Sequence, residues 1–363
     1  MTVEEELRAA FARHESLTPP AGPLRAAVDR IVVRRRRRHR RLQAGAGALA
    51  VLGLLGLAVP RVVPPLGGHT GTAEFLADRV APGGALNVLL VGVDAARDPR
   101  VHGATSVPRA DSVLLVHVPA DRSRLYLVSL PRDLMVAIPG HGTDKLNSSF
   151  QFGATASRPD LRRGYDLTRR VVTDTTGVRI DAGAVLTYPV LRRLTDGVGG
   201  VEVCLPEQVR SVHTRRVFPA GCQRLDGTGS VDLLRQRYGM TWGAQDRDRN
   251  AQRYAAGLVR QLDSGDALRN PVALNRLLAT LGPDLVTDTG DASLPDLLTR
   301  TVQASRAAPV GLALPTVEAP QRPGSTVLDE RAAPAFLTAL RQDRLAEWAA
   351  ANPDRVTALG AQR

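Results

Sequence analysis

Residues 108–147, PRADSVLLVHVPADRSRLYLVSLPRDLMVAIPGHGTDKLN, decide the fold of this chain. Within them, the apolar runs Val113–Val118 and Arg124–Leu130 flank the turn-forming residues 120–123, which predicts two paired strands. Charged residues stand where these runs begin or end, and strand ends are where a sheet presents chemistry to solvent. Any one charge is typical of a solvated sheet edge, but the set together indicates a functional site: Arg109, Asp111, Arg132, Asp133, Asp144 and Lys145.

The chain beyond residue 84 mixes strands with helical segments. Residues 86–94, LNVLLVGVD, form the near-continuous apolar run of a strand buried on both faces. Further strands are predicted at 184–188, 200–205 and 310–315, and helices at 161–177, 189–196, 246–262, 271–281, 294–306 and 332–341. Strands mixed with covering helices predict an α/β fold, a three-layer α-β-α sandwich with a mixed central sheet. We place this domain at residues 85–345, with an irregular segment at 207–226 and a tail at 346–363.

The positive charge of the chain is concentrated near its N-terminus. The chain has 363 residues, of which 43% are hydrophobic, enough for a well-buried core. The formal net charge of the chain is +12, and seven arginines lie in residues 34–41, RRRRRHRR. Without these seven arginines, the rest of the chain has a net charge of only +5. DNA or RNA binding by this run is one interpretation. The run directly precedes an apolar stretch, and the orientation of a membrane span there already explains the positive charge. We therefore expect no nucleic-acid partner.

That apolar stretch predicts a membrane anchor. Leu42–Pro60 is a run of nineteen uncharged residues, and a helix of that length spans about 30 Å, the thickness of the hydrocarbon core. We predict a cytoplasmic basic tail at 1–41, a transmembrane helix at 42–63 and an extracytoplasmic linker at 64–84. Basic residues collect on the cytoplasmic side, so we expect a single-pass protein of the cell membrane with its large domain outside. A cleaved signal peptide is the alternative, although the polar leader is long for one.

The two cysteines of the chain are Cys204 and Cys222. Both lie in the part predicted to be outside the cytoplasm, where disulfides persist, so we expect a bond between them. It would close a loop of about 18 residues and stabilise the fold by roughly 3 kcal/mol. Two buried free thiols are the alternative, since two cysteines are too few for a structural zinc site.

Acidic and basic residues near the predicted strand ends indicate phosphate chemistry. Asp94, Asp111 and Asp133 stand at strand ends or adjoining turns, and two converging carboxylates can hold Mg²⁺ or Mn²⁺. Guanidinium groups that face one site hold phosphate and pyrophosphate bidentately. A scattered arginine-rich surface is the alternative for the basic residues near element boundaries, which are Arg109, Arg132, Lys145, Arg235, Arg237 and Arg247. The chain has no P-loop, no dinucleotide-binding glycine motif, no HExxH and no GxSxG.

Seven short motifs follow one another between about Asn87 and Val259: NVLLVGVD, RADS, LVSLPRD, DKLN, GGVEV, LDG and LRQR. In this order, after a basic N-terminus and one span, they resemble the LytR-CpsA-Psr (LCP) family. The resemblance implies a phosphotransferase that takes an anionic glycopolymer, such as teichoic acid, capsule or arabinogalactan, from a polyprenyl-pyrophosphate lipid carrier. Proteins of this family join the polymer to peptidoglycan as a phosphodiester, usually with a divalent metal.

The resemblance also implies roles for individual residues. Asp94 and Asp111 would be the carboxylates that hold Mg²⁺ or Mn²⁺, and Asp111 with Arg109 would be catalytic. The phosphates of the substrate would be held by Arg132, Lys145, Arg235, Arg237 and Arg247. Apolar strands and helices behind these residues would enclose the polyprenyl tail.

The chain departs from the family pattern in one place. After the LRQR motif, the family has a line that resembles GDxxRxxRQQ, whereas this chain has GAQDRDRNAQ at 243–252. Ala244 replaces the acid, Asn250 the second arginine and Ala251 the first glutamine, which leaves reduced activity or an altered acceptor open. Two other functions also stay open: a polyprenyl-pyrophosphate phosphatase with water as the acceptor, and a regulatory or binding protein of the transcriptional-attenuator type.

Overall fold

The structure is a computed structural model of the chain. It describes residues 84–94, 107–155, 159–265, 270–282, 285–290, 294–304 and 307–359. The predicted cytoplasmic tail, transmembrane helix and nearly all of the linker lie outside the described residues. Within the described ranges, no helix is both long enough and apolar enough to cross a membrane.

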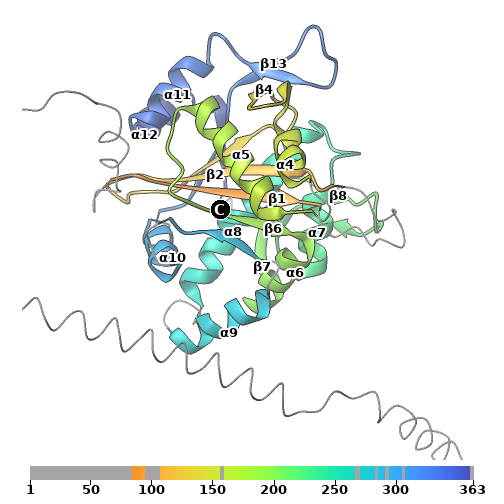
Figure 1. Ribbon diagram of the computed structural model, residues 1–363. Coiled ribbons are helices and arrows are strands. Elements are labelled where there is room, and N and C mark those ends of the chain that lie inside the picture. The colour runs from red at the N-terminus through yellow and green to blue at the C-terminus, as the bar shows by residue number, and fades with distance from the viewer. Residues whose placement is uncertain are drawn as a thin grey trace, which may run out of the picture. The chain divides into compact units, whose positions relative to one another are not determined.

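A mixed seven-stranded sheet forms the centre of the fold (Figure 1). Its strands, in spatial order, are β11 (Val286–Asp288), β6 (Ala182–Thr187), β1 (Leu86–Val93), β2 (Ala110–Val118), β3 (Tyr126–Leu130), β12 (Val310–Ala313) and β15 (Val356–Ala358). The strands β1, β2 and β3 pair antiparallel, while β6 is parallel to β1 and β12 is parallel to β3. Parallel neighbours require crossover connections, and helices lie in the connections from β1 to β6 and from β3 to β12.

Helices cover both faces of the sheet (Figure 1). One face carries α4 (Leu146–Ala154), α5 (Leu161–Thr176), α11 (Ala333–Arg341) and α12 (Leu345–Ala351), and the other carries α8 (Ala244–Ser264) and α10 (Leu294–Gln303). Since successive residues of a strand point to opposite faces, Val113 and Leu115 pack on the α5 side and Leu114 and Val116 on the α8 side. Burial on both faces explains the continuous apolar run of β2.

A smaller core lies between α8 and a group of short elements. These are α6 (Tyr188–Gly197), α7 (Gly227–Arg235), the hairpin of β7 (Val201–Leu205) and β10 (Gly221–Leu225), and the hairpin of β8 (Val209–Arg210) and β9 (Val217–Phe218). Val203, Phe218 and Tyr254 are buried in this core. The helix α9 (Pro271–Leu281) packs beside α6, and the hairpin of β13 (Thr316–Glu318) and β14 (Thr326–Leu328) lies near β4 (Met135–Ile138).

Two segments differ from the sequence-based expectation. The segment 207–226, predicted to be irregular, contains β8, β9 and β10, whose residues are largely exposed and so lack an apolar alternation. The segment 346–363, predicted to be a tail, includes most of α12 and the whole of β15. Trp348 packs edge-on against Phe336 with ring centres 4.8 Å apart, and β15 pairs with β12. Three residues are too few for β15 to show a periodicity.

The helix α8 is held close to its neighbours by two residues. Gly257 faces β7, and a Cβ atom there would lie 2.1 Å from the carbonyl oxygen of Glu202. Gln252 is buried, and its amide nitrogen lies 2.8 to 3.0 Å from three oxygens of β3 and β12. These contacts set the depth at which every residue of α8 lies against the sheet.

The predicted disulfide is confirmed. Cys204 and Cys222 are opposite residues of the β7–β10 pair, and their sulfurs are bonded. The bond therefore links the two strands of one hairpin, across a sequence separation of 18 residues.

Loss of the disulfide is expected to destabilise the domain. The double variant Cys204→Ser/Cys222→Ser should unfold with a free energy lower by roughly 3 kcal/mol, because the bond restricts the unfolded chain. Urea unfolding followed by circular dichroism measures this change. A reductant should lower the urea midpoint of the native protein and leave that of the double variant unchanged. An equal response of both proteins would contradict this account.

A side chain at position 257 is expected to push α8 away from β7. Gly257→Ala should lower the free energy of unfolding by about 2 to 3 kcal/mol, since overpacking forces the backbone to shift. Gly92→Ala is the control, because a Cβ atom there meets nothing closer than 3.3 Å, and its loss should be clearly smaller. Thermal or urea unfolding of the two variants, measured side by side, tests the difference.

Candidate active site

The two predicted metal-side carboxylates lie at one end of the paired strands β1 and β2. Asp94 directly follows β1, and Asp111 is the second residue of β2. The pairing register shifts between Gly92 and Val93, which leaves Asp111 as the extra residue of a β-bulge. The Asp94 carboxylate accepts a hydrogen bond from the backbone N–H of Arg109 at 3.0 Å. The bulge therefore fixes where both carboxylates lie at the end of the sheet.

Asp111 receives two donors from distant parts of the chain. Arg132, in the turn after β3, donates from Nη1 to Oδ1 at 2.5 Å, and the Tyr188 hydroxyl donates to Oδ2 at 3.2 Å. Burial and the nearby Asp111 carboxylate raise the pKa of Tyr188, so its hydroxyl stays protonated and can donate. Burial alone would lower the pKa of Arg132, but the carboxylates of Asp133 and Asp111 outweigh it and raise that pKa.

A second carboxylate continues this chain of charges. Asp133 accepts from Arg132 Nε at 3.4 Å and from Lys145 Nζ at 3.0 Å, and Lys145 also donates to the carbonyl of Gly324 at 2.7 Å. Lys145 ends β5 (Gly142–Lys145), which forms a hairpin with β4 and leads directly into α4. Neither this hairpin nor α4 was predicted from the sequence. They bring the motifs LVSLPRD and DKLN together.

Arg247 enters the site from α8 as a buried cation. It is 4% exposed, its Nη2 lies 3.2 Å from Asp248 Oδ1, and its Nε has no hydrogen-bond partner among the described residues. Burial raises the pKa of Asp248 to about 6, although Arg247 and Arg132 act in the opposite direction. A buried guanidinium N–H without a partner is costly, so this edge of Arg247 is suited to an anionic ligand.

The remaining predicted arginines lie at the rim of the site. Arg235 is the last residue of α7, and its guanidinium lies 5.2 Å from the centre of the Tyr188 ring. Arg237 donates instead to the hydroxyl of Tyr238 at 2.7 Å. Arg109 donates from Nε to the Gln151 side chain on α4 at 2.6 Å. The structure thus joins Arg235 to the site through Tyr188, whereas Arg109 and Arg237 are bonded to residues around it.

An apolar cavity of about 90 Å³ extends behind the charged residues, between β1–β2 and helices α6, α7 and α8. Asp111 and Arg247 are its charged lining residues, and the hydroxyl of Tyr188 bonds to Asp111. The apolar lining includes Leu90, Leu114, Leu186, Leu191, Leu234, Ala251, Ala255 and Leu258. A small cavity whose lining holds one carboxylate, one guanidinium and otherwise mostly aliphatic side chains fits an amphiphilic ligand.

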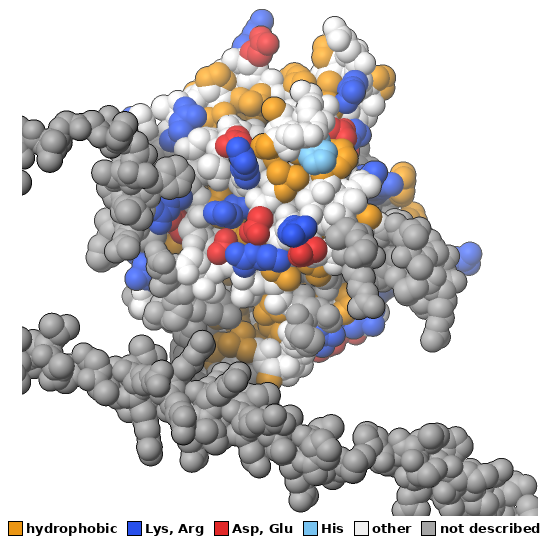
Figure 2. All heavy atoms as spheres, viewed as in Figure 1, with side chains coloured by type: hydrophobic (Ala, Val, Ile, Leu, Met, Phe, Trp, Pro, Cys, Tyr) orange, Lys and Arg blue, Asp and Glu red, His pale blue; other side chains and the backbone are white. Residues whose placement is uncertain are grey.

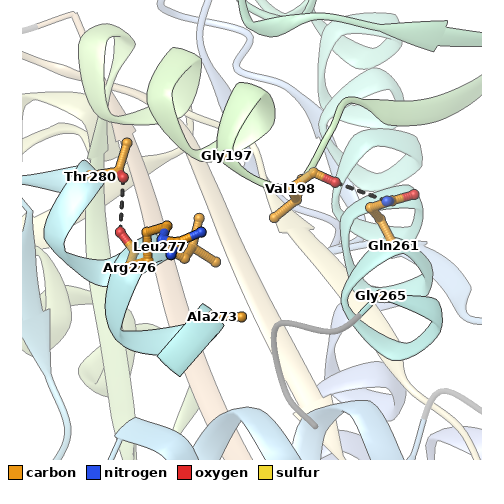
Figure 3. A pocket seen from close by; sticks show the side chains of 8 residues that line it. All are labelled: Gly197, Val198, Gln261, Gly265, Ala273, Arg276, Leu277 and Thr280. Carbon is orange, nitrogen blue, oxygen red and sulfur yellow. Dashed lines mark hydrogen bonds between the residues drawn. The ribbon is translucent and has the colours of Figure 1, made fainter. Parts of the chain in front are cut away.

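A larger cavity of about 340 Å³ lies elsewhere, between α6, α8 and α9. Figure 3 shows its walls: Gln261 donates to the carbonyl of Val198 on one side, and Arg276 and Leu277 of α9 lie on the other. It contains no carboxylate and none of the predicted site residues. We therefore place the chemistry in the smaller cavity, where opposite charges converge.

The positions that depart from the family pattern lie on the first half of α8. Asn250 is buried and accepts from Arg253 Nη1 at 2.8 Å. Ala251 lines the apolar cavity, and Gln252, which matches the family pattern, ties α8 to the sheet. Ala244 is the first residue of α8 and is exposed. Of the three departures, only that at Ala251 therefore changes the cavity wall, and the anchor of the helix at Gln252 stays in place.

The donor set at the end of the sheet fits a hard divalent cation. Asp94 follows β1 and Asp111 lies in the bulge of the adjacent strand β2, so both carboxylates lie at the same end of this strand pair. Carboxylate oxygens suit Mg²⁺ or Mn²⁺, which take further ligands from phosphate and water. The other candidate cluster among the described residues is Glu202 with Cys204 and Cys222, but these sulfurs are bonded to each other. Cysteine binds metals as a thiolate, so that cluster is not a metal site.

Sequence reasoning missed Tyr188 and Asp248. Tyr188 is the residue before Pro189 at the start of α6, and its hydroxyl reaches Asp111 from 77 residues away. Asp248 adjoins Arg247 on α8, but its burial arises only when the helix packs on the sheet. Asp248 stands two positions after Asp246 on an amphipathic helix, and such a position is expected from the sequence to be exposed to solvent. No local pattern could have identified either residue.

Several charges on α5, away from the site, are paired with carboxylates. On α5, Arg162 lies 3.2 Å from Asp166, and Arg169 lies 3.7 Å from Asp288 of the neighbouring strand β11. Figure 2 shows basic and acidic side chains next to each other across this face. A nucleic-acid interface has a continuous basic stripe, and this face has mixed charge instead.

Comparison with known proteins identifies relatives of the chain. The LytR_cpsA_psr family model matches residues 71–331. The chain is 32% identical over 277 residues to the cell wall biosynthesis protein LcpA of Corynebacterium glutamicum, a match that covers 69% of this chain and 52% of LcpA. It is 27% identical over 216 residues to the polyisoprenyl-teichoic acid–peptidoglycan teichoic acid transferase TagU of Oceanobacillus iheyensis, covering 59% of this chain and 62% of TagU. The chain thus spans about half the length of LcpA.

A solved structure has the same fold. TagT, a Bacillus subtilis protein solved bound to LI-WTA, matches with a TM-score of 0.56 and 20% identity, covering 74% of this chain and 94% of that one. At this identity the likeness shows the fold alone. The family match, by contrast, covers nearly the whole described domain, including β1, β2 and the arginines of α7 and α8. The chain therefore belongs to the LytR-CpsA-Psr family.

Proposed function

We propose that the protein is a membrane-anchored phosphotransferase that moves an anionic glycopolymer from a polyprenyl-pyrophosphate carrier to peptidoglycan. The observation that carries this proposal is the apolar cavity with Asp111 and the partly unsatisfied Arg247 at its charged end. A polyprenyl pyrophosphate has the matching chemistry, a doubly charged head on an aliphatic tail. The names of LcpA and TagU, cell wall biosynthesis protein and teichoic acid transferase, support the same reaction.

The residues at the charged end would bind the pyrophosphate and orient it. Arg247 offers its free Nε, and Arg132 could release Asp111 in part to bind phosphate oxygens, because guanidinium groups bind phosphate bidentately. Arg235 and Lys145 would add positive charge from the rim. Cations that are already in place stabilise the charge that develops on phosphorus without reorganisation.

The reaction itself exchanges a phosphoanhydride bond for a phosphoester bond. A hydroxyl oxygen of peptidoglycan attacks the phosphorus that carries the glycopolymer, and a new P–O bond forms. The P–O bond to the second phosphate breaks, polyprenyl phosphate leaves with the bonding electrons, and the hydroxyl proton passes to solvent or to the leaving phosphate. Mg²⁺ or Mn²⁺ held by Asp94 and Asp111 would supply charge neutralisation for the pyrophosphate.

The proposed location follows from the sequence upstream of the domain. The uncharged stretch 42–60 behind seven arginines would anchor the chain in the cell membrane with its N-terminus in the cytoplasm. The disulfide in the described domain supports an extracytoplasmic position, because such bonds persist outside the reducing cytoplasm. The domain would then meet the lipid carrier and peptidoglycan on the same side of the membrane.

Replacement of Arg132 is expected to abolish transfer. With the full chain in detergent, a labelled polyprenyl-pyrophosphate-linked teichoic acid precursor and peptidoglycan, Arg132→Ala should lower incorporation of label by about 100-fold or more, as for other lost oxyanion donors. Arg163→Ala on α5 is the control, because its side chain is 73% exposed and lies outside the site, and it should retain native activity. Release of free polymer without incorporation would establish a phosphatase instead, and no turnover by the native chain would favour a binding protein.

Asp248 is expected to weaken pyrophosphate binding when it is charged. Its raised pKa of about 6 means that the carboxyl is largely ionised at pH 7.5 and largely protonated at pH 5. Asp248→Asn should therefore bind farnesyl pyrophosphate more tightly than the native chain at pH 7.5, by on the order of fivefold for one nearby charge. At pH 5 the two proteins should bind alike. Titration calorimetry of both proteins at each pH tests this, and an equal ratio at both pH values would contradict it.

A further inference from the structure

One surface of the domain is formed by two loops that are bonded to each other. The first is the β8–β9 hairpin, residues 209–218, and the second is residues 236–243 between α7 and α8. Gln236 joins them, because its side-chain oxygen accepts from the backbone N–H of Val212 at 3.0 Å and its amide nitrogen donates to the Tyr238 carbonyl. We call residues 209–218 and 236–243 the two-loop surface.

The two-loop surface exposes most of the large apolar side chains that are exposed in the described part of the chain. Six large apolar residues are exposed among the residues that the structure describes. Four of these six lie on the two loops: Val212 (53%), Val217 (40%), Tyr238 (58%) and Trp242 (63%). An exposed tryptophan together with a tyrosine and two valines is unusual on a monomeric soluble surface. Such a patch generally marks a surface that meets a partner.

Positive charge surrounds these apolar side chains. Arg210, Arg215 and Arg216 are exposed on the hairpin, and the guanidinium of Arg237 lies 4.7 Å from the centre of the Tyr238 ring. Nearby carboxylates are engaged: Asp226 lies 3.6 Å from Arg216, and Asp246 accepts from the Trp242 backbone N–H at 2.7 Å and from Arg249 at 3.0 Å. Glu207, just before β8, and Asp226 are both exposed, and Asp226 is the one that lies beside an arginine of the hairpin. The surface is therefore apolar at its tips and cationic around them.

The two-loop surface adjoins the candidate active site along the chain. The loop 236–243 begins one residue after Arg235, which lies over Tyr188, and ends four residues before Arg247. Contact of this loop with a membrane would therefore place the charged end of the cavity close to the lipid phosphates. This step rests on the proposed function, because it assumes that the substrate arrives from a lipid bilayer.

We propose that the two-loop surface docks on an anionic lipid bilayer, with Trp242 and Tyr238 in the interface and the arginines against lipid phosphates. Tryptophan and tyrosine favour the membrane interface because their rings are apolar with one polar group. Each arginine near an anionic surface adds electrostatic attraction. A glycan chain is the competing occupant. It would be held best by carboxylate or amide acceptors beside the rings, whereas no exposed side chain of residues 209–218 and 236–243 is a carboxylate or an amide.

The tryptophans of the chain supply a direct test. There are two, Trp242, which is exposed, and Trp348, which is 7% exposed and packs on Phe336. The full chain is reconstituted into phosphatidylcholine–phosphatidylglycerol vesicles whose acyl chains are brominated, and tryptophan emission is recorded. The native chain should lose about half of its emission relative to vesicles without bromine, whereas Trp242→Phe should lose almost none, because Trp348 is shielded. The proposal would be overturned if brominated lipid left the tryptophan emission of the native chain unchanged.

A charge-reversal variant separates docking from chemistry. Arg215→Glu/Arg216→Glu should abolish the bromine quenching of Trp242, while Arg163→Glu on α5 should keep it. Both variants should bind farnesyl pyrophosphate in detergent as the native chain does, since none of the three arginines contacts the cavity. Quenching that persists in the double variant would overturn the role of the arginines.

A shift in Trp242 emission caused by soluble peptidoglycan fragments, without bromine quenching, would assign the surface to glycan instead. The two proposals can be refuted independently. Native transfer activity without bromine quenching would refute docking on the bilayer and leave the proposed function standing.

Discussion

The close packing of α8 against the sheet and β7 is the constraint on which the site depends. Gly257 allows the helix to approach the β7 backbone, and the Gln252 amide reaches into the sheet from the other side of the same helix. Together they hold α8 at a depth where Ala251 and Ala255 line the cavity and Arg247 lies at its charged end. A helix even slightly farther from the sheet would leave Arg247 in solvent, where a lone guanidinium binds phosphate weakly.

The charges of the site balance one another without a ligand. Asp111, Arg132, Asp133 and Lys145 alternate in sign along one continuous chain of contacts. These contacts hold each side chain in position. A ligand that binds to these residues must therefore replace ion pairs that already exist between them. Arg247 differs, because its Nε is buried without a partner among the described residues. The site is thus ordered before the ligand binds, with one donor kept available.

Much of the fold and part of the site could be predicted from the sequence. The strands β1, β2 and β3 were predictable because burial on both faces gives them continuous apolar runs, and α5 and α8 because their apolar residues repeat at helical spacing. The short strands β8, β9 and β15 were not, since two or three residues carry no period. Asp111 and Arg132 were found because they stand at strand ends. Tyr188 and Asp248 were missed because their roles come from contacts between elements far apart in the chain. Arg237 shows the converse, since a motif position alone did not indicate that its guanidinium bonds to Tyr238.

The last strand in the spatial order of the sheet also protects an edge. β15 pairs with β12 at one end of the sheet. Without this pairing, β12 would present an unpaired backbone edge, and such edges recruit strands from other molecules. Because β15 has only three residues, it offers few unpaired backbone groups of its own and so shields the sheet from edge-to-edge association.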